Sequence, residues 1–391
     1  MKVDVDVVIV GGGIAGLWTL ARLRKEGYNA VLLEAEALGA GQTRYAQGII
    51  HGGTKYALTG KITASSEAVA NMPSIWRACL DGSGEVDLRN ASLISEAHYL
   101  WSTANLASKI TGFFASQVMR ARTTALQPQQ RPAIFQHGDF RGNIYRLDEP
   151  VFDTLSVLRA LAGPVMSSIV AVKKQSLRLQ SSALKFEASN GSAYELGFRK
   201  LILMAGQGNE GLLMSAGLSQ PEMQLRPLKM VMMRGGLTEK VFAHCMGAGV
   251  NPRITITSHA DKDNNIVWYL GGQLAEEGIK RTDSEQIKKA QREVAELIPW
   301  QNLDAVQWAT LDINRAEVQY ADGHRPDTFF AGEQDDIIAA WPTKLALAPL
   351  LSQRVLELVS AIEKTRPELP DWPAPPLAEY PWCEATRWDM E

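Results

Sequence analysis

Apolar positions in the first part of the chain form two strand-like runs with a helix-like run between them. Residues 4–10 (DVDVVIV) are mostly valine and isoleucine, which is typical of a strand buried on both faces. From residue 14 to residue 23 apolar side chains recur at helical spacing, and Gly27 ends that pattern. A second apolar run, residues 30–33, ends at Glu34. The pattern predicts a β-α-β unit of a parallel sheet.

The turn between the first strand and the helix contains Gly11, Gly13 and Gly16 in the spacing G-x-G-x-x-G. Gly11 allows a sharp turn, Gly13 lets a pyrophosphate approach the backbone, and Gly16 lets the helix pack closely on the sheet. A diphosphate would then lie at the positive end of the helix. Glu34 follows about twenty residues later, where an acid accepts a hydrogen bond from a ribose hydroxyl. The unit predicts a dinucleotide site, and the acid favours NAD or FAD over NADP.

Periodicity also predicts the elements of the remaining chain. Helices are expected at residues 60–72, 102–122, 145–162 and 282–297, and strands at residues 86–100, 165–172, 228–234, 253–258 and 266–271. The short strands after residue 225 indicate a mostly antiparallel sheet with helices on one side, as expected for a substrate domain. The stretch from residue 366 to residue 382 is rich in proline and aromatic residues, which indicates an extended strap.

A second G-x-G-x-x-G is formed by Gly206, Gly208 and Gly211. It could begin a separate NAD(P)H domain, and the protein would then be a reductase with two dinucleotides. The context argues against this interpretation, because no apolar strand ending in an acid follows and residues 217–227 are loop-like.

Composition narrows the class of protein. A chain of 391 residues exceeds one ordinary core, so two domains are expected. The net charge of −3 argues against a nucleic acid partner. The three cysteines are far apart, so neither a disulfide framework nor a zinc site is indicated, and a reducing, cytoplasmic location fits best. The acidic first strand excludes a signal peptide, and no apolar run is long enough to cross a bilayer. A peripheral membrane contact stays open.

Residues 39–58 have neither helical nor strand periodicity and are rich in Gly, Gln, Thr and Tyr. They form either an ordinary connecting loop or a second loop that contacts the cofactor. Together with the opening β-α-β unit, the segments Gly41-Gln-Thr and Gly48-Ile-Ile-His-Gly-Gly-x-x-Tyr resemble the FAD-dependent D-amino-acid oxidase superfamily. Its members include glycine and sarcosine oxidases, glycerol-phosphate dehydrogenases and 2-hydroxyglutarate oxidases.

The resemblance implies a flavoprotein with an α/β + α+β fold. A Rossmann-like FAD-binding domain of the glutathione-reductase type would be interleaved with a mostly antiparallel substrate domain. The implied FAD-binding domain is discontinuous (residues 1–80, 144–224 and 314–365), the substrate domain comprises residues 81–143 and 225–313, and residues 366–391 are a proline-rich C-terminal tail. The strand that ends at Ala205 and Gly206 would return to the FAD sheet, and we favour this over a second dinucleotide domain.

The resemblance also implies which residues contact FAD. They are Gly11, Gly13, Ile14, Ala15, Gly16, Glu34, Ala35, Gln42, Thr43, Arg44, Gln47, Gly48, Ile49, Ile169, Ala205, Gly206, Arg315, Pro342, Thr343, Lys344 and Leu345. Ile169 matches the residue whose backbone holds the adenine. The chain departs from the family at residues 341–345 (WPTKL), where relatives are glycine-rich. Pro342 suits a first helical turn there, and the helix dipole would stabilise negative charge on reduced flavin.

Three residues are candidates for catalysis. His51 could be the base that takes a substrate proton, could pack against the flavin, or could attach it covalently, as a histidine in this loop does in some relatives. Arg315 matches the arginine that clamps a substrate carboxylate in amino-acid oxidase relatives, and the alternative is an ion pair. Lys344 either adds a fixed positive charge near the flavin or is simply solvated.

The other histidines and two tyrosines are weaker candidates. His259 and His324 lie in segments expected to face the same cavity, and Tyr269 and Tyr320 could cap a substrate carboxylate. The remaining histidines, expected to be structural, are His98, His137 and His244.

The sequence therefore predicts an FAD-dependent oxidoreductase that oxidises the C–N or C–O bond of a small carboxylate-bearing amine or 2-hydroxy acid by hydride transfer to the flavin. O₂, a quinone or another acceptor would reoxidise it. The Arg315 clamp favours an amine, and residues 50–52 (IHG) favour a hydroxy acid. The C-terminal tail keeps open a flavin-binding electron-transfer protein or complex subunit, and the second glycine motif keeps open an NAD(P)H-dependent reductase. No metal ion is expected.

Overall fold

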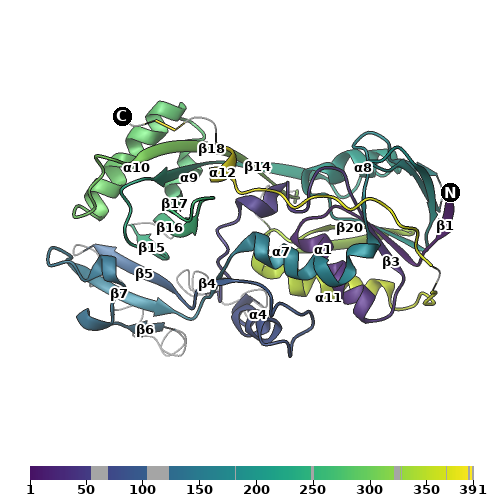
Figure 1. Ribbon diagram of the computed structural model, residues 1–391, viewed down its shortest axis with the longest axis horizontal. Coiled ribbons are helices and arrows are strands. Elements are labelled where there is room, and N and C mark those ends of the chain that lie inside the picture. The colour runs from purple at the N-terminus through teal and green to yellow at the C-terminus, as the bar shows by residue number, and fades with distance from the viewer. Residues whose placement is uncertain are drawn as a thin grey trace.

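The chain forms two large sheets, which the figures show from two sides. The computed structural model describes residues 1–53, 69–103, 123–180, 182–247, 251–320, 326, 328–366, 368–385 and 388–389. Figure 1 shows an elongated molecule with the N-terminus and β1 at one end and α10 at the other. The last part of the chain, in yellow, runs along the molecule from one end towards the other.

A six-stranded sheet carries the nucleotide-binding pattern, in the order β19-β20-β13-β2-β3-β9. Its strands are β2 (Val7–Val10), β3 (Ala30–Glu34), β9 (Ile169–Ala171), β13 (Lys200–Leu203), β19 (Phe330–Gln334) and β20 (Ile337–Trp341). All neighbours are parallel except β19 and β20. Because β13 lies between β2 and β20, the second glycine motif belongs to the same sheet as the first. The expected return of the chain to this sheet is confirmed.

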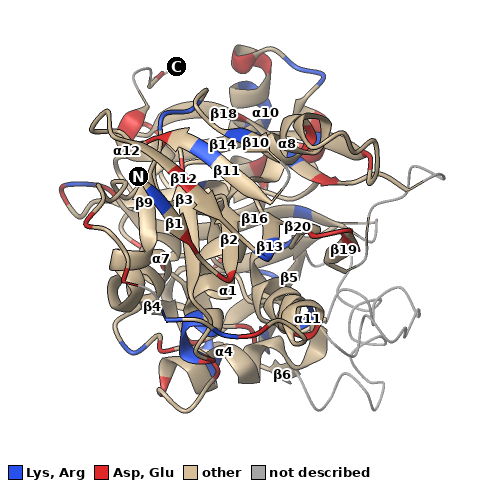
Figure 2. Cartoon of the chain, turned by 90° about the vertical axis from the view of Figure 1, so that its right-hand side faces the viewer, with Lys and Arg blue, Asp and Glu red and all other residues tan. Residues whose placement is uncertain are grey.

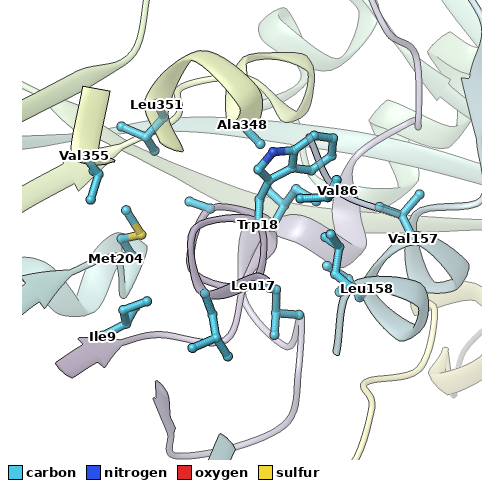
Figure 3. Packing of buried hydrophobic residues seen from close by; sticks show 14 of the residues in the cluster. Ile9, Leu17, Trp18, Val86, Val157, Leu158, Met204, Ala348, Leu351 and Val355 are labelled. Atoms are coloured by element: carbon cyan, nitrogen blue, oxygen red, sulfur yellow. The ribbon is translucent and has the colours of Figure 1, made fainter. Parts of the chain in front are cut away.

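Helices cover this sheet around one apolar core. They are α1 (Ile14–Lys25), α4 (Met72–Leu80), α7 (Thr154–Ala162) and α11 (Ala348–Val359). Leu17 and Trp18 of α1 are fully buried and pack in one cluster with Leu158 of α7 and Leu351 of α11 (Figure 3). Truncating a buried leucine of this kind to alanine costs about 2–5 kcal/mol. The apolar stripe that predicted α1 is therefore the side of the helix that holds the layers together.

The first predicted strand is broken in two, which corrects the expectation of one strand over residues 4–10. β1 (Lys2–Asp4) belongs to a separate four-stranded sheet with β10 (Arg178–Gln180), β11 (Ala183–Glu187) and β12 (Ala193–Gly197). The break falls at Asp6, whose buried carboxylate accepts hydrogen bonds from the Asn29 amide at 2.8 Å and the Thr365 hydroxyl at 2.7 Å. A buried carboxylate needs such donors, and Thr365 comes from the far end of the chain.

Basic and acidic residues are interspersed along the chain at the end of the molecule that carries this small sheet (Figure 2). Two ion pairs, Lys173 with Glu187 and Lys185 with Glu195, lie on it, the second at 3.5 Å. Exposed pairs of this kind contribute roughly 0–1 kcal/mol. The described part of this face therefore carries both positive and negative residues, and neither kind forms a continuous patch.

Three other predicted elements differ from the structure. The helix expected from residue 145 begins at Thr154, because residues 142–147 form a strand between two others in the second large sheet. The strand expected over residues 86–100 is replaced by β4 (Leu93–Ser95) and β5 (His98–Thr103). The strand expected over residues 165–172 is only β9, after a 3₁₀ segment. The helices expected at 60–72 and 102–122 lie largely outside the described residues.

The second large sheet has eight strands in the order β18-β14-β17-β16-β15-β5-β7-β6. Besides β5 these are β6 (Thr123–Ala125), β7 (Gly142–Leu147), β14 (Met223–Arg234), β15 (Ala243–Met246), β16 (Pro252–Ala260), β17 (Ile266–Gly271) and β18 (Gln307–Val318). Only the pair β15–β5 is parallel. The expected mostly antiparallel sheet is confirmed. Its strands come from residues 98–147 and 223–318, so residues 144–147 and 314–318 lie in this sheet and not in the six-stranded one, and the division into domains stays a prediction.

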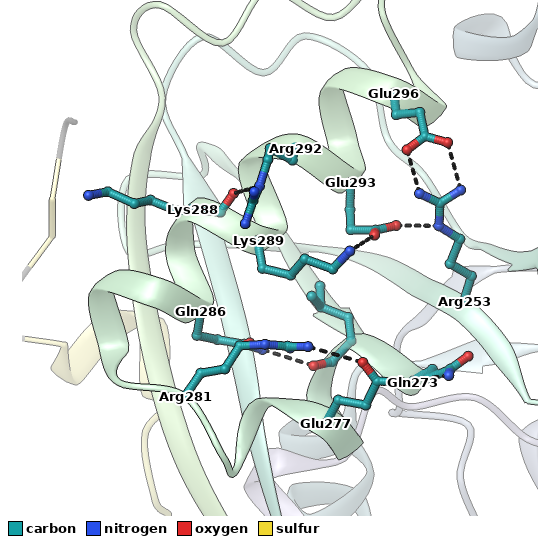
Figure 4. Close-up of polar contacts among 11 residues, drawn as sticks. Arg253, Gln273, Glu277, Arg281, Gln286, Lys288, Lys289, Arg292, Glu293 and Glu296 are labelled. Atoms are coloured by element: carbon teal, nitrogen blue, oxygen red, sulfur yellow. Dashed lines mark hydrogen bonds and ion pairs between the residues drawn. The ribbon is translucent and has the colours of Figure 1, made fainter.

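Helices α9 (Gln273–Gly278) and α10 (Asp283–Leu297) pack against this sheet. Thr282 and Glu285 form a capping box at the start of α10, which satisfies amides that have no partner within the helix. At the other end, Arg253 of β16 binds Glu293 and Glu296 of α10, the second at 2.6 Å (Figure 4). These contacts hold β16 in place, and β16 carries two threonines of the candidate site.

The C-terminal tail packs against earlier parts of the same chain. Leu377 pairs with Leu38, and Trp372 donates its indole N–H to Ser167 at 2.9 Å. Further on, Trp382 is 1% exposed, stacks on Tyr380 at 4.4 Å and donates to Ala260 at 3.0 Å. The described tail residues therefore strap the nucleotide sheet to the eight-stranded sheet. Packing within the chain thus accounts for the apolar residues of the tail, and the electron-transfer or complex subunit stays an untested alternative.

Candidate active site

The glycine turn is packed too closely for any side chain at two of its positions. Gly11 has φ +117°, and a Cβ built on it would lie 2.5 Å from the Met204 carbonyl oxygen. A Cβ on Gly16 would lie 1.9 Å from the Gly11 oxygen. The chain thus brings β2, α1 and the end of β13 together, as the motif predicts.

The start of α1 is prepared for an anion. Gly13 is the N-cap and provides no side-chain cap, and the first turn contains no acidic residue. The Ile14 amide donates to Thr43 Oγ1 at 3.1 Å, whereas Ala15 and Gly16 have no acceptor within the helix. A Cβ on Gly13 would meet only Thr43 Oγ1, at 3.0 Å. Bare amides at the positive end of a helix fit the diphosphate of FAD.

Glu34 is fixed at the carboxyl end of β3, next to this turn. Its carboxylate accepts hydrogen bonds from the Gly12 amide at 2.6 Å and the Glu36 amide at 2.7 Å. Burial raises its pKa, and these backbone hydrogen bonds oppose the rise. The side chain is therefore held where it can accept a ribose hydroxyl. Ala35 follows it directly.

The loop after β3 crosses the strands of the eight-stranded sheet. At its start Gln42 Oε1 accepts the Ala316 amide of β18 at 3.0 Å. In its middle Gln47 Nε2 donates to the Tyr269 oxygen of β17 at 3.0 Å and to Thr257 Oγ1 of β16 at 3.3 Å. The loop thus joins the two large sheets along its length.

The next residues of this loop are fixed by the segment before α7. The Gly48 oxygen accepts the Phe152 amide at 2.9 Å, and Ile49 pairs with Val151 and is buried. Ile49 therefore has a core environment as well as its expected place beside the cofactor.

The carboxyl ends of β13 and β20 are joined by Asn209, a residue that the sequence did not single out. Asn209 accepts the Ala205 amide at 2.7 Å and donates to the Ala340 oxygen at 3.1 Å. The Trp341 indole donates to the Gly206 oxygen at 3.0 Å. A Cβ on Gly206 would meet no described atom within 4 Å, so there is open space beside this residue.

The loop after β20 is strained. Thr343, a β-branched residue, has φ +57°, is buried, and donates its hydroxyl to the Thr328 oxygen at 3.1 Å. Such backbone strain costs of order 1–3 kcal/mol and clusters at functional sites. Pro342 is not in a first helical turn, which corrects that expectation: a 3₁₀ turn begins at Leu345, and Pro349 opens α11.

Two predicted cofactor contacts point elsewhere. The Arg44 guanidinium lies 2.6 Å from Glu384 and 2.8 Å from the Tyr45 hydroxyl, so it binds the C-terminal strap. Ile169 is fully buried and lies level with Leu32, two residues before the edge of the sheet that Glu34 occupies. Both remain predictions as FAD contacts.

His51 forms a cluster with Glu149, His244 and His98. His51 Nδ1 lies 3.1 Å from Glu149 Oε2, and Oε1 of the same carboxylate accepts the Gly52 amide at 2.9 Å. The ring of His244 lies 5.8 Å from that of His51 and 4.1 Å from that of His98. Burial tends to raise the pKa of Glu149, but the hydrogen bonds of His51 and Gly52 and the nearby histidines outweigh it and lower the pKa.

The sequence did not predict this cluster, because its members come from separate elements. His51 is in the loop after β3, Glu149 lies between β7 and β8 (Val151–Phe152), His98 begins β5, and His244 is in β15. His98 and His244 were expected to be structural. The pairing of β5 with β15 brings them together.

The weaker candidates lie in apolar packing. His259 is 6% exposed, stacks on Trp382 at 4.6 Å and lies 2.9 Å from Thr257 Oγ1. Tyr269 is buried and donates to the Tyr45 oxygen at 3.2 Å. Tyr320 is 41% exposed. Tyr56, His324 and most of residues 321–327 lie outside the described residues.

Arg315 lies on a strand that is distant in the sheet order from the His51 cluster. Arg315 is on β18, opposite Arg226 of β14, and its Nε donates to the Arg226 oxygen at 3.4 Å. Three strands separate β18 from β15, which carries His244. Because neighbouring strands are about 4.8 Å apart, β18 and β15 are about 19 Å apart along the sheet. Lys344 is half-buried in the loop after Thr343.

A parallel sheet with a glycine turn, an acid at the end of its second strand and an antiparallel sheet against it is typical of a dinucleotide-dependent oxidoreductase. A family model described as DAO, FAD dependent oxidoreductase, matches residues 6–346. The chain belongs to this family, and its cofactor is FAD.

Relatives agree with this assignment. Probable FAD-dependent oxidoreductase PA4991 of Pseudomonas aeruginosa is 47% identical over 381 residues, 96% of this chain and 97% of that protein. Its crystal structure superposes with a TM-score of 0.85, at 42% identity over 98% of both chains. Glycine oxidase of Geobacillus kaustophilus has a TM-score of 0.64 at 16% identity, covering 93% of this chain and 96% of its own, and shows the fold alone. Among the described residues, no helix combines the length and apolarity of a membrane span.

Proposed function

We propose that the protein oxidises a small carboxylate-bearing 2-hydroxy acid or amine at the carbon that bears the hydroxyl or amino group. The observation that carries this proposal is the hydrogen bond between His51 and the buried carboxylate of Glu149, at the end of the loop that joins the two sheets. FAD, when bound, supplies the hydride acceptor. Structural neighbours are named glycine oxidase and iminodiacetate oxidase, after carboxylate-bearing amines, and L-alpha-glycerophosphate oxidase, after a hydroxyl compound that carries a phosphate in place of a carboxylate.

The dyad suits proton removal. Glu149 can accept the Nδ1 proton of His51, which fixes the tautomer and directs Nε2 away from the carboxylate. Nε2 is then the atom that takes the substrate proton. His51 has 41% of its side chain exposed, so it is accessible, whereas Glu149 at 3% is not. His51 is therefore the proposed base and Glu149 its positioning residue.

This arrangement favours a hydroxyl substrate. An alcohol loses its O–H proton during hydride transfer and gains from a base in contact with it, whereas an amine can bind already neutral. The Arg315 clamp favours an amino acid instead, since two parallel hydrogen bonds hold a carboxylate. The amine therefore stays the second candidate, with Arg315 as its proposed clamp and Lys344 as a proposed charge near the flavin.

An anaerobic absorbance screen tests the proposal. The holoenzyme is mixed with 2-hydroxy acids, glycerol phosphate, D- and L-amino acids and N-methyl amino acids, with NADH and NADPH as comparisons. We expect one substrate class to bleach the flavin band, and air then separates an oxidase from a dehydrogenase. Bleaching by nicotinamides alone would identify a reductase and overturn the proposal.

Variants measured in the same assay test which residues take part in flavin reduction. Loss of a general base lowers the rate by about 10²–10⁴-fold, so His51→Gln should slow reduction by that factor with FAD still bound. Glu149→Gln should slow it less. His137→Gln is the control, because His137 is 48% exposed and pairs with Asp139 at 3.6 Å, on another part of the surface. Its reduction rate should equal that of the wild type.

The cytoplasmic location and the electron acceptor stay predictions. The cysteines Cys79, Cys245 and Cys383 are free thiols, which supports a reducing compartment.

A further inference from the structure

The cluster around His51 contains the donor set of a metal site. His51, Glu149 and His244 each offer one ligand atom, and these atoms all lie within 4.8 Å of one another. Two imidazoles and one carboxylate are a ligand set that Zn²⁺ uses in proteins. The three residues come from three separate elements, so no sequence spacing announces the site.

The closest pair already has the spacing of metal ligands. With metal–ligand bonds of about 2.0–2.1 Å, two ligands of a tetrahedral ion lie about 3.4 Å apart. His51 Nδ1 and Glu149 Oε2 are 3.1 Å apart. The third ligand has to approach by roughly 1.4 Å to complete the triangle, which a side-chain rotation of His244 or His51 provides.

Glu149 and His244 each have a further hydrogen-bond partner, as metal ligands in proteins usually do. The second oxygen of Glu149 accepts the Gly52 amide at 2.9 Å, and His244 Nδ1 lies 2.8 Å from Thr255 Oγ1. Such outer contacts fix the tautomer and the ring orientation of a ligating histidine. Thr255 is itself buried on β16.

His98 provides an independent sign of a missing partner. It is fully buried, its ring lies 4.1 Å from that of His244, and among the described residues neither ring nitrogen has a hydrogen-bond partner of ordinary distance and angle, although backbone groups of Tyr99 and Ile256 lie beside it. A buried polar group without a partner costs about 1–3 kcal/mol, and an ion is one explanation of such a group.

We infer that His51, Glu149 and His244 bind one divalent transition-metal ion, with His98 beside them as a further ligand. The ion would interfere with the proposed base, because it takes His51 Nδ1 and the Glu149 carboxylate, whose hydrogen bond orients the ring for proton transfer at Nε2. Inhibition of turnover by the ion therefore rests on the proposed function, whereas binding of the ion does not.

Zinc binding to the resting holoenzyme tests the inference without any substrate. Chelator-treated protein with FAD bound is titrated with ZnCl₂, and the bound zinc is counted after equilibrium dialysis. We expect one Zn²⁺ per chain, and an X-ray absorption spectrum with imidazole scattering at about 2.0–2.1 Å. Outer-shell changes alone weaken such sites 10–100-fold, so loss of a ligand in His244→Gln should weaken binding by at least about 100-fold.

Two further variants keep the test decisive. His244→Cys replaces one zinc ligand by another and should retain the stoichiometric site, which also answers the case in which His244→Gln fails to fold. His137→Gln, at an exposed histidine beside an aspartate, should bind zinc like the wild type. Zinc held as tightly by folded His244→Gln as by the wild type, or no stoichiometric zinc in the wild type, would overturn the inference. A wild type that binds zinc yet oxidises no substrate would refute the proposed function alone.

Discussion

The buried imidazole of His259 predicts that the protein loses stability in mild acid. His259 lies under Trp382 of the C-terminal strap, and burial lowers its pKa to about 3. In the unfolded chain the pKa returns to about 6.5. Between these two values the unfolded chain binds one more proton than the folded one, so the free energy of unfolding falls as the pH falls. The slope from this residue is about 1.4 kcal/mol per pH unit, or about 2 kcal/mol between pH 6.5 and 4.5.

Urea unfolding at pH 6.5, 5.5 and 4.5 measures this dependence. Carboxylates also contribute to acid sensitivity, so the informative quantity is the difference between the wild type and His259→Gln, in which an uncharged amide can still reach Thr257. We expect the variant to show a slope that is smaller by about 1.4 kcal/mol per pH unit. The exposed His137→Gln should keep the wild-type slope. An equal slope in His259→Gln and the wild type would show that His259 is solvated in the folded protein, and the reasoning would fail.

Three further predictions concern the cofactor and the substrate. Gly13→Ala should fold, since its Cβ meets only Thr43 at 3.0 Å, yet raise the Kd of FAD at least about tenfold in a fluorescence titration, whereas Gly41→Ala, with nothing within 4 Å, should not. Glu34→Gln keeps one acceptor for two amides and loses the charge, so the Kd of FAD should rise about tenfold. In a double-mutant cycle on flavin reduction, His51→Gln and Arg315→Gln should be additive within about 0.5 kcal/mol. A larger coupling would place both on one substrate.

The nucleotide-binding unit could be predicted from the sequence because its signals are local. Strand, glycine turn, helix and acid follow one another within residues 7–34, and the structure has them in that order. The break at Asp6 could not be predicted in this way. Its partner Thr365 is 359 positions away, and nothing near Asp6 reports that hydrogen bond.

The same distinction explains the strand at residues 142–147. Its apolar residues continue the spacing of α7, so the sequence favours one helix from residue 145. Residues 142–147 form a strand instead, because they pair with β5 on one side and with β6 on the other. Non-local partners override local propensity wherever a segment is needed inside a sheet.

The loop of residues 42–51 decides how the site should be understood. Its start is hydrogen-bonded to β18 and its middle to β16 and β17, and its end lies beside His244 of β15. It therefore spans the five strands from β18 to β15, with contacts to β18, β17, β16 and β15. Arg315 therefore lies near the start of the loop and His51 at its end. A small 2-hydroxy acid has its carboxylate and hydroxyl only about 3 Å apart, by ordinary bond lengths. Arg315 lies on β18, about 19 Å along the sheet from β15, and His51 lies beside His244 of β15, so we do not expect one such molecule to contact both. If His51 takes the proton, another group near β15 or β16 has to hold the carboxylate, and Arg315 then serves the cofactor end of the loop.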